Sequence, residues 1–158
     1  MQSQQWKEIY VKQIALTEAI PYELLLDADP SRSAIEKYLS FSEIHIAVLK
    51  GKTIGVLVLF PLDIHTLEIK NIAVAEKFQG KGIGKILLNT ATRIAMNRGL
   101  TSITIGTSNA SVAQLSLYQK KGFEISGIKL NFFTDNYPEA LFENDIQCKH
   151  MIMLEKKL

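Results

Sequence analysis

The pattern of apolar and polar positions predicts seven strands. In some segments apolar side chains alternate with polar ones, and in others they form short β-branched runs, which are typical of half-buried and fully buried strands. The segments are 10–14, 44–49, 53–60, 67–74, 102–107, 123–130 and 150–155. The second and third are separated only by residues 50–52, with Gly51 between two lysines, so they are predicted to form a hairpin.

Helical spacing of apolar residues predicts four helices. The longest has apolar residues at intervals of three and four from Ile83 onward and ends before the stop signal Gly99. Ser33 and Glu36 have the spacing of a capping box, which predicts the start of another helix near Ser33. The other two predicted helices cover residues 19–26 and 111–121. The stretch between the last two strands, residues 134–149, is predicted to be irregular.

The order of these elements predicts an α/β (α+β) fold. A hairpin requires an antiparallel pair, whereas the strand–helix–strand crossover around the longest helix requires a parallel pair if both strands share a sheet. A mixed sheet with helices on both faces satisfies both requirements. The chain has no internal repeat and no linker-like segment, so residues 1–158 are predicted to form one domain.

Composition excludes several classes of protein. The chain of 158 residues is 47% hydrophobic and 22% charged, with a net charge of +2, which is typical of a globular protein and too mild for a general nucleic-acid binder. Cys148 is the only cysteine, and no segment has zinc-ligand spacing, so neither a disulfide nor a metal is predicted. The longest apolar run, 54–61, is far below the roughly 20 residues that span a bilayer. With no secretory signal at the start, a cytoplasmic location is expected.

The strongest chemical signal is the glycine-rich turn Gln79–Lys85 between a strand and a helix. Three glycines in five residues let backbone N–H groups converge on one point, at the positive end of the helix that follows. The turn does not fit the P-loop pattern, because Ile86 follows Lys85 where a serine or threonine is required. It does not fit the dinucleotide fingerprint either, because Lys85 stands where the third glycine is required. The turn therefore predicts a phosphate or pyrophosphate site of another kind. A tight turn without a ligand is the alternative.

Two motifs at the right separation give a family resemblance. The first is Gln79-x-x-Gly82-x-Gly84 after a strand that ends Ile-Ala-Val, and the second is Tyr118-Gln-Lys-Lys-Gly-Phe123. Together they resemble the GNAT superfamily of N-acetyltransferases, over most of the chain. The resemblance implies a mostly antiparallel sheet of about seven strands in which the fourth and fifth splay apart.

The resemblance also implies a site for acetyl-CoA. In it, backbone amides of the turn would hold the pyrophosphate, and the end of the fourth strand would pair with the pantetheine arm and polarise the thioester carbonyl. Asn109 would hydrogen-bond the arm, and Tyr118 would lie near the sulfur. The implied donor-binding residues are Ile72, Ala73, Val74, Gln79, Gly80, Lys81, Gly82, Ile83, Gly84, Lys85, Asn109 and Tyr118.

The chemistry of amine acetylation asks for a base and an acid. An alkyl amine, with a pKa of about 10, arrives protonated and must lose a proton before it attacks a thioester. Tyr118 is the candidate acid for the leaving thiolate, and ordinary aromatic packing is its alternative role. Glu68, on a largely apolar strand, is the candidate base; burial there would raise its pKa. The alternatives for Glu68 are a solvent-facing charge or a partner for Lys70, with water as the base.

The acceptor side is less defined. The resemblance implies that residues 134–149, together with the first two helices, border the acceptor. Residues 134–149 carry four acidic residues, which favours a cationic amine over other acceptors. A solvated acidic loop is the alternative. We therefore predict an acetyl-CoA-dependent N-acetyltransferase, with a non-catalytic acyl-CoA-binding module and an unrelated nucleotide-binding protein as alternatives. Neither a membrane nor a nucleic acid is an expected partner, and both monomer and homodimer remain open. The four acidic residues are Asp135, Glu139, Glu143 and Asp145.

Overall fold

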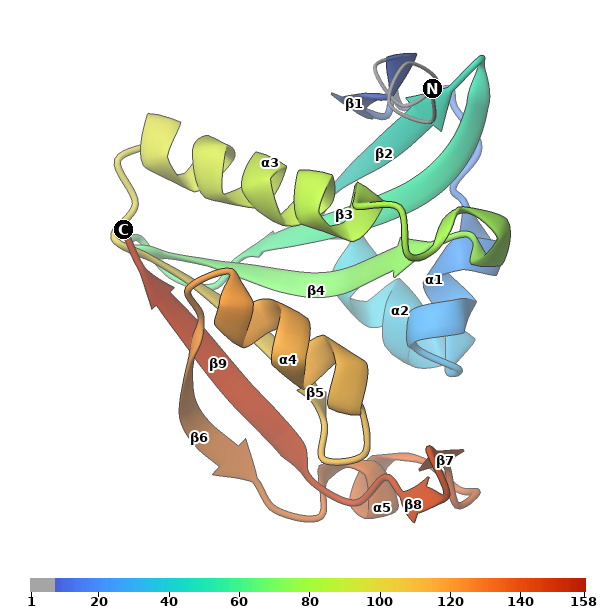
Figure 1. Ribbon diagram of the computed structural model, residues 1–158, viewed down its shortest axis with the longest axis vertical. Coiled ribbons are helices and arrows are strands. Elements are labelled where there is room, and N and C mark those ends of the chain that lie inside the picture. Colours follow the sequence, from blue (N-terminus) through green and yellow to red (C-terminus); the bar gives the residue numbers. More distant parts are fainter. Residues whose placement is uncertain (1–7) are drawn as a thin grey trace.

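The computed structural model describes residues 8–158, and its main feature is a seven-stranded mixed sheet (Figure 1). Every neighbouring pair is antiparallel except β4 and β5, which are parallel. This confirms the predicted mixed, mostly antiparallel sheet. In spatial order the strands are β1 (Tyr10–Gln13), β2 (Glu43–Leu49), β3 (Lys52–Pro61), β4 (Thr66–Val74), β5 (Ser102–Ser108), β9 (Met151–Lys157) and β6 (Glu124–Lys129).

Helices cover both faces of this sheet. α1 (Tyr22–Ala28) and α2 (Arg32–Leu39) lie behind β2–β4 in Figure 1, and α3 (Ile83–Asn97) and α4 (Val112–Lys120) lie in front. Among residues 8–158, none of the helices combines the length and the apolar character that a membrane crossing requires.

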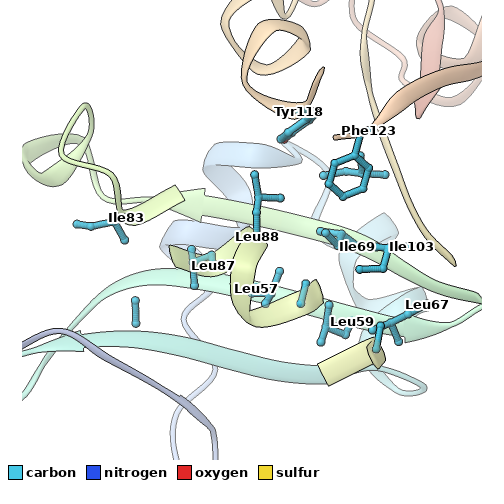
Figure 2. Packing of buried hydrophobic residues seen from close by; sticks show 14 of the residues in the cluster. Leu57, Leu59, Leu67, Ile69, Ile83, Leu87, Leu88, Ile103, Tyr118 and Phe123 are labelled. Carbon is cyan, nitrogen blue, oxygen red and sulfur yellow. The ribbon is translucent and has the colours of Figure 1, made fainter. Parts of the chain in front are cut away.

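The alternation of side chains on β3 divides the core into two parts. Leu57 and Leu59 point toward α3, where they are packed with Leu87 and Leu88 (Figure 2). Val56 and Val58 belong to the cluster that includes Leu25 and Ile35 of α1 and α2. Because a strand buried on both faces has apolar residues at every position, this segment reads as a continuous apolar run.

The two halves of the sheet are joined by a short ladder. β4 pairs with β5 only over residues 66–69 and 102–105, although both strands continue beyond that point. The register between β4 and β3 shifts next to this point, so that Lys70 has no partner on β3. A bulge of this kind bends and twists a strand. In Figure 1, β5 and β9 diverge from β4 beyond the ladder, as the resemblance implied.

The capping box predicted at Ser33 does not form. α2 is capped by Ser31, whose hydroxyl accepts a hydrogen bond from the N–H of Ala34 at 3.2 Å, and not by a capping box at Ser33. Glu36 is instead paired with Arg32, one turn away, at 3.0 Å.

The segment predicted to be irregular contains regular structure. It includes the short helix α5 (Phe132–Asn136) and a hairpin of β7 (Phe142–Glu143) and β8 (Ile146–Gln147). Asn144 and Asp145 form its turn at positive φ, a conformation that asparagine and aspartate adopt more readily than most residues. Strands of two residues are too short to produce an alternation, so the hydrophobic pattern does not reveal them.

Candidate active site

A cavity of about 880 Å³ lies where β4 and β5 diverge. On one side it is bordered by the end of β4 and the glycine-rich turn, and on another by the end of β5 and α4. The end of α1 and parts of the segment from Phe133 to Met151 complete the wall. The glycine motif and the tyrosine motif of the sequence therefore open into one space.

The glycine-rich turn places several free N–H groups at one end of this cavity. Gly80 and Gly82 have φ values of 72° and 86°, which only glycine adopts without strain, and Gly82 is the N-cap of α3. The first hydrogen bond of α3 runs from the N–H of Ile86 to the carbonyl of Gly82. The preceding amides in the first turn, those of Ile83, Gly84 and Lys85, therefore have no partner inside the helix. This arrangement suits an anion such as a pyrophosphate.

The end of β4 offers an unpaired strand edge. Ile72, Ala73 and Val74 pair with β3 on one side, whereas their other edge faces the gap left by β5. The Nε2 of Gln79 donates to the carbonyl of Val74 at 3.0 Å and holds the turn against the strand. Such an edge can pair with an extended ligand in the way that a further strand would.

Tyr118 is a buried tyrosine on the cavity wall. Its side chain is 5% exposed, and its ring lies 6.2 Å from that of Phe123 (Figure 2). Burial, and secondly the charge of Glu143, raise the pKa of Tyr118 above its usual value. Glu143 itself accepts a hydrogen bond of 2.7 Å from the hydroxyl of Ser111. Tyr118 is consequently a proton donor throughout the neutral pH range.

This raised pKa predicts how Tyr118 titrates. The group ionises above its unfolded-state value of about 10, so its contribution to stability is present below pH 10 and is lost as the pH rises further. The absorbance change of tyrosinate, compared between the wild type and Tyr118→Phe, is expected to differ only above about pH 10. A difference centred near pH 7 would show that Tyr118 is ionised in the working range.

Three predicted site residues lie outside the cavity wall, whereas the others line it. Glu68 is 8% exposed and forms an ion pair of 2.8 Å with Lys70, the partner that the sequence suggested as its alternative role. Lys81 belongs to the glycine-rich turn but is not among the lining residues. The side chain of Asn109 accepts from the N–H groups of Lys149 and His150 at 2.8 and 3.0 Å. Asn109 therefore attaches the start of β9 to the end of β5.

The resemblance implied that the first two helices border the acceptor, but sequence reasoning singled out neither Asp29 nor Tyr137 as a residue of this wall. Asp29 follows α1, and its Oδ1 accepts a hydrogen bond of 2.7 Å from the hydroxyl of Tyr137, which follows α5. Of the four acidic residues noted between the last two predicted strands, only Glu143 lines the cavity. No local motif signals the Asp29–Tyr137 pair, because its members lie 108 residues apart.

Within residues 8–158 no group of three or more His, Cys, Asp or Glu side chains is placed to hold a metal ion.

The chain belongs to the acetyltransferase (GNAT) family, whose model matches residues 9–123. It is therefore an acyltransferase.

Three relatives support this assignment. The chain is 47% identical over 133 residues to the uncharacterized N-acetyltransferase YvbK of Bacillus subtilis, covering 84% of this chain and 86% of that protein. It is 48% identical to a GNAT family acetyltransferase from Elizabethkingia anophelis with acetyl-CoA bound, with a TM-score of 0.94 and coverage of 96% of this chain and 99% of that one. It is 45% identical to the IAA acetyltransferase from Bacillus cereus, with a TM-score of 0.91 and coverage of 95% and 99%.

Proposed function

We propose that the protein transfers the acetyl group of acetyl-CoA to a primary amine by direct attack within a ternary complex. The observation that carries this proposal is the single cavity that joins the glycine-rich turn, the open edge of β4, Tyr118 and Asp29. Donor and acceptor can then meet in one space, and no transfer through an enzyme side chain is needed.

The donor half of the cavity fits acetyl-CoA in three respects. The unpartnered amides at the start of α3 match a pyrophosphate, and Lys85 adds a positive charge to the same wall. The free edge of Ile72–Val74 matches the amide groups of a pantetheine arm. When bound, acetyl-CoA supplies an acetyl group activated as a thioester. The backbone N–H groups of β4 are donors suited to polarise its carbonyl oxygen.

Tyr118 is proposed as the acid. Its hydroxyl stays protonated because burial disfavours the phenolate, and it can donate to the sulfur that leaves. Asn109 keeps its predicted role as a hydrogen-bonding partner of the donor arm, and Lys81 its role as a positive charge near the pyrophosphate.

Glu68 is proposed as the base, and substitution tests that role. If Glu68 removes the proton of the amine, Glu68→Gln lowers kcat/KM by about 10² to 10⁴. Glu124→Gln, which changes an exposed carboxylate on β6, serves as the control. Equal activity of Glu68→Gln and the wild type would assign proton removal to water.

The function itself is tested by release of free thiol. Acetyl-CoA is mixed with the protein and a panel of amines that contains monoamines, a polyamine, an aminoglycoside and a lysine peptide. We expect thiol release that depends on at least one amine, together with a product heavier by one acetyl group. A non-catalytic acyl-CoA-binding module would instead show binding of acetyl-CoA without thiol release for any of the amines.

A thermal-shift comparison tests the alternative that the chain is an unrelated nucleotide-binding protein. Ligand at 100 times its Kd adds about 2.7 kcal/mol of stability, which is a measurable rise in Tm. We expect this rise with CoA and acetyl-CoA and not with ATP or NAD. The reverse order would indicate a nucleotide-binding protein of another kind.

A further inference from the structure

The cavity wall contains a carboxylate, Asp29, that is only partly used. Asp29 accepts hydrogen bonds from the hydroxyl of Tyr137 at 2.7 Å and from the N–H of Ser31 at 3.1 Å, and both bonds end on Oδ1. None of the ion pairs found among residues 8–158 includes Asp29. The carboxylate is thus fixed in orientation, lines the cavity and has no cation beside it.

An unpartnered amide oxygen belongs to the same wall. Asn71 of β4 is 4% exposed, and its Nδ2 donates to the carbonyl of Leu25 and to the hydroxyl of Tyr38, both at 3.0 Å. These two bonds fix the amide, since a flipped side chain would direct its oxygen at the carbonyl of Leu25. Oδ1 is buried and has no hydrogen-bond donor. Buried oxygens of this kind are uncommon, and one on a cavity wall points to a donor supplied by a ligand.

The two groups belong to one cluster. Burial, and more weakly the charge of Asp29, raise the pKa of Tyr38 to about 12, while the hydrogen bond from Asn71 acts in the opposite direction. Tyr38 therefore lies within electrostatic reach of Asp29 and in direct contact with Asn71. The free lone pairs of the Asp29 carboxylate and the Oδ1 of Asn71 can therefore each accept a hydrogen bond.

The neighbouring wall is apolar and aromatic. The ring of Phe133 stacks on that of Tyr137, with centroids 5.7 Å apart and planes 30° from parallel. Leu141, Phe142 and Met151 line the same cavity. These side chains suit an apolar or aromatic body. The further carboxylates of the wall are those of Asp27 and Glu143, and Glu143 already accepts a hydrogen bond from Ser111.

We propose that Asp29 and Asn71 bind the nitrogen of the acceptor, and that the acceptor is a monoamine with an apolar or aromatic body. Asp29 attracts the ammonium form in which the amine arrives. The neutral oxygen of Asn71 can still accept an N–H after the proton has been lost, which keeps the nitrogen in place. The proposal rests on the proposed N-acetyltransferase function and assigns the specificity of that same site.

Steady-state kinetics with 2-phenylethylamine as the probe test this assignment. We expect Asp29→Asn to raise KM for the amine by about tenfold or more, because the charge is lost while the side chain keeps its shape. Both kcat and KM for acetyl-CoA are expected to change less than about threefold. Calorimetric titration of the amine into the protein–CoA complex is expected to show the same loss of affinity.

Two control variants separate this role from a general loss of charge or polarity. Asp63→Asn removes an exposed carboxylate that does not line the cavity. Thr104→Val removes the other buried side-chain oxygen found without a partner among residues 8–158, which also lies outside the wall. Both are expected to leave KM for the amine unchanged. An Asp29→Asn variant that matches these controls in kinetics and in calorimetry overturns the proposal.

The amine panel distinguishes the remaining outcomes. A wild type that prefers spermidine to 2-phenylethylamine overturns the substrate class. Turnover that is insensitive to Asp29 overturns this inference and leaves the N-acetyltransferase function standing. Thiol release with none of the amines contradicts the proposed function itself.

Discussion

Replacing Gly82 by aspartate is expected to weaken CoA binding by about a hundredfold or more. The residue lies at the N-cap of α3 on the cavity wall, and nothing lies within 4 Å of the position that a Cβ would occupy. The new side chain is therefore accommodated without a clash, but it places a negative charge where a pyrophosphate would bind. Juxtaposed like charges cost several kcal/mol, and about 1.4 kcal/mol corresponds to each tenfold change in affinity. Calorimetry with CoA measures the effect.

Gly99→Asp is the matched control. Gly99 follows the other end of the same helix, has a φ of 71° and likewise has no atom within 4 Å of a Cβ position. Both variants introduce the same side chain at a positive φ, so both are expected to lower Tm by similar amounts. Only Gly82→Asp is expected to lose CoA binding. If the two variants bind CoA equally well, the pyrophosphate site is not at this turn.

Replacing Tyr118 by phenylalanine is expected to lower kcat by about a hundredfold while KM for acetyl-CoA changes little. The substitution removes one hydroxyl from a buried ring and keeps its packing against Phe123. A positioned acid contributes about 10² to 10⁴ in rate, and its loss acts on the transition state rather than on ground-state binding. Initial rates at saturating amine, with acetyl-CoA varied, separate the two parameters.

Tyr10→Phe controls for the loss of a tyrosine hydroxyl, since Tyr10 lies on β1 and is 53% exposed. We expect its kinetics to equal those of the wild type. Equal losses in kcat and in affinity for acetyl-CoA in Tyr118→Phe would make the hydroxyl a binding group. Unchanged kinetics would show that Tyr118 has only a packing role.

The proposed donor half of the site is built from local features, so the sequence could predict it. A helix start needs particular residues within one turn, and Gly80 and Gly82 have the positive φ values that such a turn requires. The buried strand that ends at Val74 shows as an apolar run directly before it. These features lie within about 20 residues of one another, so their spacing carries the information.

The acceptor half could not be read in the same way. Asp29 and Tyr137 are brought together only when the ends of α1 and α5 meet at the cavity wall, and neither residue belongs to a local motif. The orphaned oxygen of Asn71 depends on which partners its Nδ2 finds in α1 and α2. Tertiary contacts of this kind follow from the packing of elements and not from periodicity.

The brief ladder between β4 and β5 has a consequence for the lifetime of the protein. Only four residue pairs join the two halves of the sheet directly, so a donor lying along β4 acts as an additional strand across the opening. Binding then stabilises the folded chain by mass action, in proportion to the logarithm of donor concentration. If the donor binds along β4 as proposed, resistance of the protein to proteolysis is expected to rise with the concentration of acetyl-CoA.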